Sequence, residues 1–154
     1  MLKDIQFSLK NSFKGALSHI NPVKAVTELD IKDARKHISE ESHNIWQLLF
    51  HAVFWQDMFI ENIKGNDPKW DDEGSWPTEE HMQNDENFEK LKNRFKEGVE
   101  ELEKLMETLD LEEKLPNNRD IPRLQLFTVT ITHNSYHVGQ IVFLKKILNE
   151  QHSG

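Results

Sequence analysis

Apolar and polar positions alternate with a helical period over the first twenty residues. Apolar side chains recur three or four positions apart, which is typical of a helix that buries one face. These side chains are Leu2, Ile5, Leu9, Phe13, Ala16, Leu17 and Ile20. Pro22 interrupts the pattern because proline has no backbone N–H to donate. The segment therefore predicts a first helix that reaches to about Ile20.

A second helical pattern follows in "SEESHNIWQLLFHAVFWQDMFIENIKG", residues 39–65. Ser39 or Ser42 is the expected N-terminal cap, and Gly65 is the expected stop. The next stretch, "GNDPKWDDEGSWPT", is rich in Gly, Pro, Asp and Trp and has no helical period. A connection of about 15 residues is unusual in a compact domain and is more often functional or a crossover than filler.

A third helix is predicted to begin after Thr78, which is placed to cap it, and to run through "EEHMQNDENFEKLKNRFKEGVEELEKLMETL". The Glu and Lys residues on its other face indicate a solvated surface. After the break "DLEEKLPNNRDIPR", a fourth helix is predicted with Pro122 in its first turn and its end near Leu148. The stretch "FTVTITH" favours a strand by composition, but it is continuous with this helix.

Four helices with one long connection between the second and the third predict an all-α fold, a four-helix bundle with a crossover. The chain of 154 residues has the size of one domain, so we expect a single domain over residues 1–154. A chain of this length buries a core without metals or disulfides, so a metal here would be functional before structural.

The formal net charge of -8 argues against nucleic-acid partners, which need a basic surface. There is no cysteine, so disulfides, thiolate ligands and a cysteine nucleophile are excluded. The first twenty residues lack the apolar core and cleavage site of a signal peptide. No run of about 18 apolar residues offers a membrane span. We therefore expect a soluble cytoplasmic protein without a membrane partner.

His133 and His137 lie one turn apart on the fourth helix, on the face that carries Leu126, Gln140 and Leu144. His51 falls on a mostly apolar face of the second helix. A buried neutral imidazole must satisfy both ring nitrogens, and a single ion would satisfy one nitrogen on all three rings. The pattern is thus equally consistent with a divalent site with open positions and with three separately satisfied core histidines, and both interpretations stay open.

The other histidines carry weaker signals. Helix ends, loops or polar faces are the expected places of His19, His37, His81 and His152, where side chains are exposed by default. His43 begins the second helix about 80° around the axis from His51, and its role stays open.

Three stretches in this order, "SHNIWQLLFHAVFWQDMFIENIKG", "SWP" and "THNSYHVGQIVFLKKIL", resemble the DinB-like superfamily, also described as YfiT-like. The likeness spans nearly the whole chain. It implies a four-helix bundle with up-down-down-up topology, often dimeric, that holds nickel, zinc or a similar divalent ion on three histidines. Carried over to this chain, those ligands are His51, His133 and His137.

The resemblance includes several activities: bacillithiol- or mycothiol-dependent S-transferases, a mycothiol-dependent isomerase and metal-dependent hydrolases. We hypothesise a metal-dependent S-transferase for a bacillithiol-type thiol cosubstrate, with Trp55, Met58 and Tyr136 as pocket walls or simply core. Gln140 is a candidate for orienting a ligand or water, with a packing role equally open. A metal-dependent hydrolase and a non-catalytic metal-binding stress protein are the alternatives.

A second apolar stripe lies on the fourth helix away from the histidines. It consists of Phe127, Ile131, Val138 and Val142. A helix that is apolar on two faces either lies centrally in a bundle or meets a partner chain. We expect a homodimer.

Overall fold

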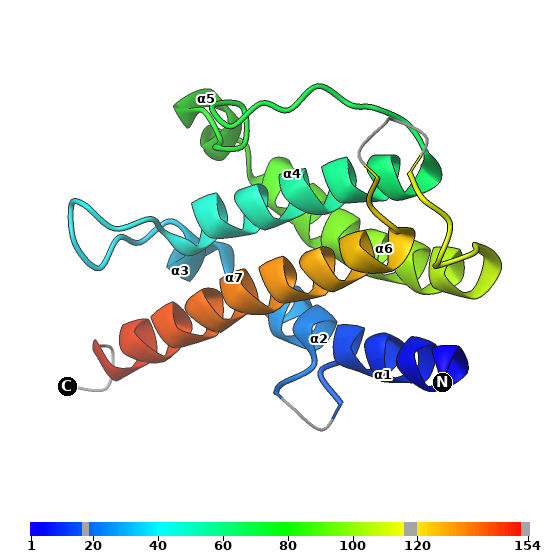
Figure 1. The fold of residues 1–154 in the computed structure, drawn as a ribbon. Helices are drawn as coiled ribbons and strands as arrows, with labels where there is room; N and C mark the ends of the chain where they lie inside the picture. The colour runs from blue at the N-terminus through cyan, green and yellow to red at the C-terminus, as the bar shows by residue number, and fades with distance from the viewer. Residues whose placement is uncertain (17–18, 116–119, 152–154) are drawn as a thin grey trace.

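The computed structural model describes residues 1–16, 19–115 and 120–151. Over these ranges the protein is all-α, as expected, with seven helices and no sheet (Figure 1). One isolated antiparallel bridge joins Lys114 and Pro122. The helices are α1 (Leu2–Phe13), α2 (Pro22–Thr27), α3 (Ile31–Ala34), α4 (Ile45–Lys64), α5 (Glu79–Gln83), α6 (Asp85–Thr108) and α7 (Arg123–Gln151).

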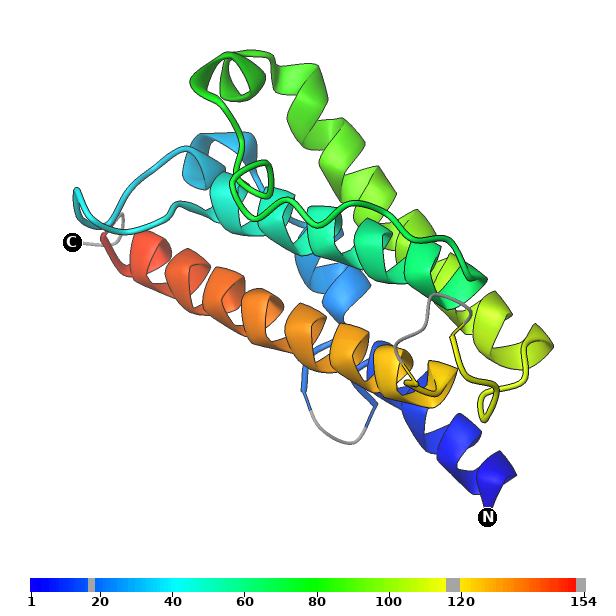
Figure 2. The ribbon, with the colours of Figure 1, turned by 45° about the horizontal axis from the view of Figure 1, so that its top comes forward.

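A few long helices pack together to form the core. α4 lies between α6 and α7, and α1 also packs against α6 and α7 (Figures 1 and 2). The largest fully buried side chains come from these long helices and their connections, and they include Trp46, Phe88, Phe95 and Phe127. Because α4 contacts both α6 and α7, its side chains are the ones best placed to meet those of α7 across the core.

The first predicted helix is shorter than its pattern indicates. α1 ends at Phe13, and Gly15 follows with φ +68° in a turn. A side chain at Gly15 would place its Cβ 2.5 Å from the carbonyl oxygen of Ile20, so the turn requires glycine. The extension toward Ile20 was therefore wrong: Ile20 is 49% exposed, and Leu17 lies outside the described residues.

Asn44 caps α4, and neither Ser39 nor Ser42 does. Its side chain accepts a hydrogen bond from the Gln47 N–H, while the Gln47 side chain accepts one from the Asn44 N–H, which is a capping box. Gly65 ends the helix in the left-handed conformation with φ 96°, as expected. The two ends fix the register of α4 and hence the face on which His51 lies.

No helix interrupts residues 66–78, and this connection runs back along α4 toward α5 (Figures 1 and 2). Thr78 caps α5 as predicted, since its hydroxyl accepts from the His81 N–H. The third predicted helix is divided at Asn84, whose side chain accepts from the Glu86 N–H and caps α6. A second cap inside the helical pattern explains the break.

α7 begins at Arg123, directly after Pro122, and the β-branched stretch within it is helical. The second apolar stripe lies inside the protein: Phe127 and Val138 are buried, and Ile131 and Val142 pack against the core. α7 is therefore apolar on two faces because it lies centrally, and the homodimer stays a prediction without that support. None of the described helices is long and apolar enough to cross a membrane.

Candidate metal centre

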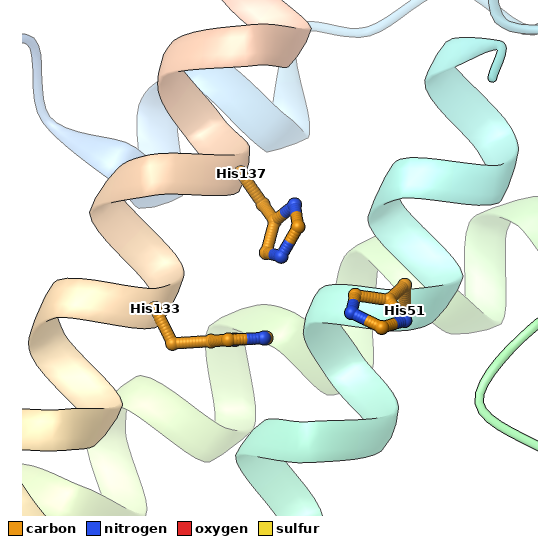
Figure 3. Close-up of side chains that lie close together, drawn as sticks. All are labelled: His51, His133 and His137. Carbon is orange, nitrogen blue, oxygen red and sulfur yellow. The ribbon is translucent and has the colours of Figure 1, made fainter. Parts of the chain in front are cut away.

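Three histidine side chains from α4 and α7 point toward one another across the interface between these helices (Figure 3). His133 and His137 lie one turn apart on α7, with ring centroids 4.5 Å apart. The His51 ring lies 4.8 Å from that of His137 and 5.5 Å from that of His133. One nitrogen of each ring can be chosen so that all three lie within 4.8 Å of one another. This cluster could hold a metal ion.

The cluster is partly shielded from water by aromatic rings. His137 is buried, at 7% exposure, and His51 and His133 are half-buried. The Phe59 ring stands edge-on to His133 at 5.9 Å between centroids. A site that is neither sealed nor open to bulk water suits an ion that keeps positions for a small ligand.

Two of the three imidazoles are held in one tautomer by hydrogen bonds behind them. The Nδ1–H of His137 donates to Gln140 Oε1 at 2.8 Å. The Ser75 hydroxyl donates to the carbonyl of Asp72 at 2.6 Å, so Ser75 Oγ accepts from Nδ1–H of His51 at 3.1 Å. In both rings Nε2 is therefore unprotonated and keeps its lone pair, and an imidazole nitrogen in this state can ligate a metal.

His133 supplies the test of whether the residues present fit an ion. Its Nδ1 is buried and has no hydrogen-bond partner in the described part of the chain. A buried polar atom without a partner costs about 1 to 3 kcal/mol, so this ring lacks a contact that a core histidine would have. The all-imidazole donor set fits a divalent ion of the kind that nitrogen ligands bind.

The electrostatics of the cluster keep all three rings neutral near pH 7. Burial, with smaller contributions from His137 and His51, lowers the pKa of His133 to about 4. Burial is also the main cause that lowers the pKa of His51 and of His137. Only the neutral imidazole has a lone pair for a metal, so protons compete weakly for this site.

The candidate pocket residues fall in three different environments. Trp55 is 7% exposed, with its ring 6.3 Å from His51 and 5.2 Å from Trp70. Met58 is half-buried and packs against the core. Tyr136 is 64% exposed, stands edge-on to His137 at 5.0 Å, and accepts a long hydrogen bond from Gln140 Nε2 at 3.4 Å. Trp55 and Tyr136 therefore border the cluster, whereas Met58 has a core environment.

Ser75 and Trp76 of the long connection were not assigned roles from the sequence. The Trp76 ring is stacked between two histidines, 4.0 Å from His43 and 4.2 Å from His51. His43 is thus not one of the three clustered histidines but is linked to them through Trp76. The sequence signals for this segment were the length and composition of the connection and the "SWP" stretch of the family resemblance, and none of them assigned a role to Ser75 or Trp76.

The remaining histidines divide by environment. His19 and His37 are exposed as predicted. The prediction was wrong for His81, which is half-buried with its ring 4.9 Å from Phe50. His152 lies outside the described residues. Among the side chains that the structure places, the metal-competent group contains three histidines and no carboxylate.

The sequence profile of the DinB superfamily matches residues 22–141, which include all three clustered histidines. No curated protein matches the chain, and no solved structure does either.

Proposed function

Because this chain belongs to the DinB superfamily, we propose that it is a divalent-metal-dependent enzyme that transfers a bacillithiol-type thiol onto small electrophiles. Nickel or zinc is the proposed ion, with His51, His133 and His137 as its ligands. The observation that carries this proposal is the convergence of three neutral imidazoles, two of them held from behind by Gln140 and Ser75. When bound there, a divalent ion would lower the pKa of a thiol or water in its open positions.

Two features favour thiol transfer over hydrolysis. The chain has no cysteine, so a sulfur nucleophile has to arrive with a cosubstrate. A thiol has an ordinary pKa of about 8.5 and loses its proton far more readily than water.

The proposed reaction is a substitution at an electrophilic carbon. The sulfur of the cosubstrate forms a bond to that carbon, the leaving group departs with its bonding electrons, and the thiol proton passes to solvent. Ser75 and Gln140 keep Nδ1 protonated on His51 and His137, so the ligating nitrogens stay deprotonated throughout. Trp55 and Phe59 reduce the access of water to the histidines.

We further propose that α1, α4, α6 and α7 form the up-down-down-up four-helix bundle that the family resemblance implies. In support, α4 packs on α6 and α7, and α1 packs on the same two helices. The long connection that returns along α4 is the crossover that such a topology needs (Figure 2).

A conjugation assay tests the transferase proposal. Untagged protein loaded with nickel or zinc is incubated with bacillithiol and a panel of small electrophiles, before and after chelation. The same preparations are offered activated esters as a test for hydrolysis. We expect thiol consumption that disappears on chelation and in His137→Ala but persists in His19→Ala, a matched change at an exposed histidine outside the cluster.

Metal-dependent ester cleavage without thiol consumption would replace the transferase proposal by hydrolysis. Bound metal with neither activity would replace it by a non-catalytic metal-binding role.

A further inference from the structure

A cavity of about 210 Å³ lies between the segment that leads into α4 and the C-terminal half of α7. Its walls are Ser42, His43, Leu48, Gln140, Phe143 and Leu144. It is large enough for several water molecules or for one ring with a short substituent.

The cavity adjoins the histidine cluster from both helices. On the α7 side, Gln140 lines the cavity and accepts the hydrogen bond from Nδ1–H of His137. On the α4 side, His43 lines the cavity and stacks on Trp76, whose other face stacks on His51. A molecule in the cavity would therefore be separated from His137 by one side chain, Gln140, and from His51 by two, His43 and Trp76.

The walls of the cavity favour an apolar occupant. Leu48 and Leu144 are buried at 4% and 9% exposure, while the Phe143 ring is 63% exposed and offers a free aromatic face. The polar groups are mostly engaged: Ser42 Oγ donates to the Ser39 carbonyl, and Gln140 bonds to His137 and Tyr136. His43 is exposed and touches Trp76 through its ring face, and this contact leaves its ring nitrogens free to hydrogen-bond a ligand.

Among the residues that the structure describes, no charged side chain lines this cavity. A second cavity of about 210 Å³ lies beside Phe7 and serves as a comparison, because Lys10 and Glu107 form an ion pair on its wall. An anionic ligand would find no cation in the cavity beside the cluster, and the net charge of -8 would further disfavour it. The two cavities thus have equal volume and different chemistry.

We propose that the cavity beside the cluster binds the electrophile of the reaction, as a small uncharged molecule with a ring-sized apolar body. Phe143 packs against that body, and His43 offers a hydrogen bond to its polar end. The identity of the occupant as an electrophile rests on the proposed thiol transfer, but the binding itself does not.

Fluorine NMR titration tests the binding with two matched probes, 4-fluorobenzyl alcohol, which is uncharged, and 4-fluorobenzoate, which is anionic. The titrations use the whole protein as purified and after chelation, since a carboxylate would also bind a metal. We expect the alcohol to bind in both preparations and the benzoate to bind at least about tenfold more weakly after chelation, because its charge has no partner in the cavity.

The Phe143→Ala variant tests the contribution of Phe143 to the cavity wall. Because Phe143 is exposed, we expect the fold to tolerate this substitution. It should weaken binding of the alcohol about three- to tenfold, the range expected from loss of one aromatic contact. Phe7→Ala is the matched control, since Phe7 is 70% exposed and lines the comparison cavity. It should leave binding unchanged.

Equal binding of the alcohol to the parent protein and to Phe143→Ala would overturn the proposal, as would tighter binding of the benzoate after chelation. These outcomes are separable from failure of the transferase proposal. Probe binding without any metal-dependent conjugation would keep the cavity and reject thiol transfer. Conjugation with an unchanged KM for the electrophile in Phe143→Ala would keep thiol transfer and reject the cavity.

Discussion

The N-terminal cap of α4 and the interface between α4 and α7 both contain histidine side chains. The two regions differ in the hydrogen-bond partners that the protein supplies to the ring nitrogens. At the cap, Nδ1–H of His37 donates to the Ser42 carbonyl at 2.7 Å, and its Nε2 accepts from Asn44 Nδ2 at 3.0 Å. At the interface, His137 has a protein partner for Nδ1, while the buried Nδ1 of His133 has none among the described residues.

The two regions differ in whether the protein itself satisfies both ring nitrogens, which distinguishes a structural histidine from a candidate metal ligand. Both nitrogens of His37 are satisfied within the protein, so no ion is needed there. In the cluster, three rings face one another and burial keeps them neutral, while the buried Nδ1 of His133 has no hydrogen-bond partner among the described residues. Histidine count and helical spacing alone do not make this distinction.

The largest expected effect is loss of the ion when one clustered ring is removed. His137→Ala should lower metal affinity by more than about 100-fold, because loss of even an outer partner typically costs about 10- to 100-fold. Mass spectrometry of metal content and a competition titration with a chelating dye measure this, with His19→Ala as control. A variant that retains one equivalent of metal would show that His137 is not a ligand.

Much of this candidate site could be predicted from the sequence, because both helical segments that carry its histidines show clear local patterns. The i, i+4 spacing of His133 and His137 is visible in any helix, and the period of α4 places His51 on an inward face. Ser75 was beyond reach, since it lies 24 residues from His51 in a connection without a period. The cap of α4 was misassigned because Ser39, Ser42 and Asn44 are all good caps, and only the structure shows which side chain meets an N–H.

The second stripe of α7 shows another limit of sequence reasoning. A pattern that is apolar on two faces does not say whether the second face meets the same chain or another one. Here Phe127 and Val138 are buried within the chain. The all-α fold was predictable because long helical periods are strong signals, whereas Gly15 and Asn84 broke elements through local turn and cap chemistry.

Gln140→Ala should have the next largest effect. It removes the acceptor for Nδ1–H of His137, so the ring loses both its fixed tautomer and its orientation. We expect metal affinity to fall by about 10- to 100-fold, measured with the same dye competition. Gln140→Glu keeps an acceptor at this position and serves as the rescue variant. If Gln140→Ala binds metal as tightly as the parent, Gln140 has only a packing role.

Acid should destabilise the metal-free protein through the cluster. The pKa of His133 is lowered to about 4 in the folded protein, against 6.5 for an ordinary histidine. As the pH falls below 6.5, the unfolded chain binds more protons than the folded chain does. The free energy of unfolding therefore decreases toward pH 4. The lowered pKa values of His51 and His137 act in the same direction.

Urea denaturation of chelated protein at pH 7, 6 and 5 measures this decrease. His133→Gln removes the titrating ring with the lowest pKa of the three, so its free energy of unfolding should decrease less over the same range. Parallel pH profiles for the parent and His133→Gln would mean that His133 does not carry the predicted proton linkage.

The smallest effect is expected at the cap, where His37→Ala should leave metal binding unchanged. The ring is exposed, so water replaces its two hydrogen bonds, and we expect a loss of only about 0.5 to 1.5 kcal/mol in the free energy of unfolding.

Because His37 accepts from the same Asn44 side chain that caps α4, the two residues should not act independently. Combined with Asn44→Ala, which removes a cap worth about 1 kcal/mol, His37→Ala should therefore add less than its own effect. Urea denaturation of the two single variants and the double variant measures this coupling. Additive losses would show that His37 does not support the cap, and loss of metal in His37→Ala would break the distinction between the two regions.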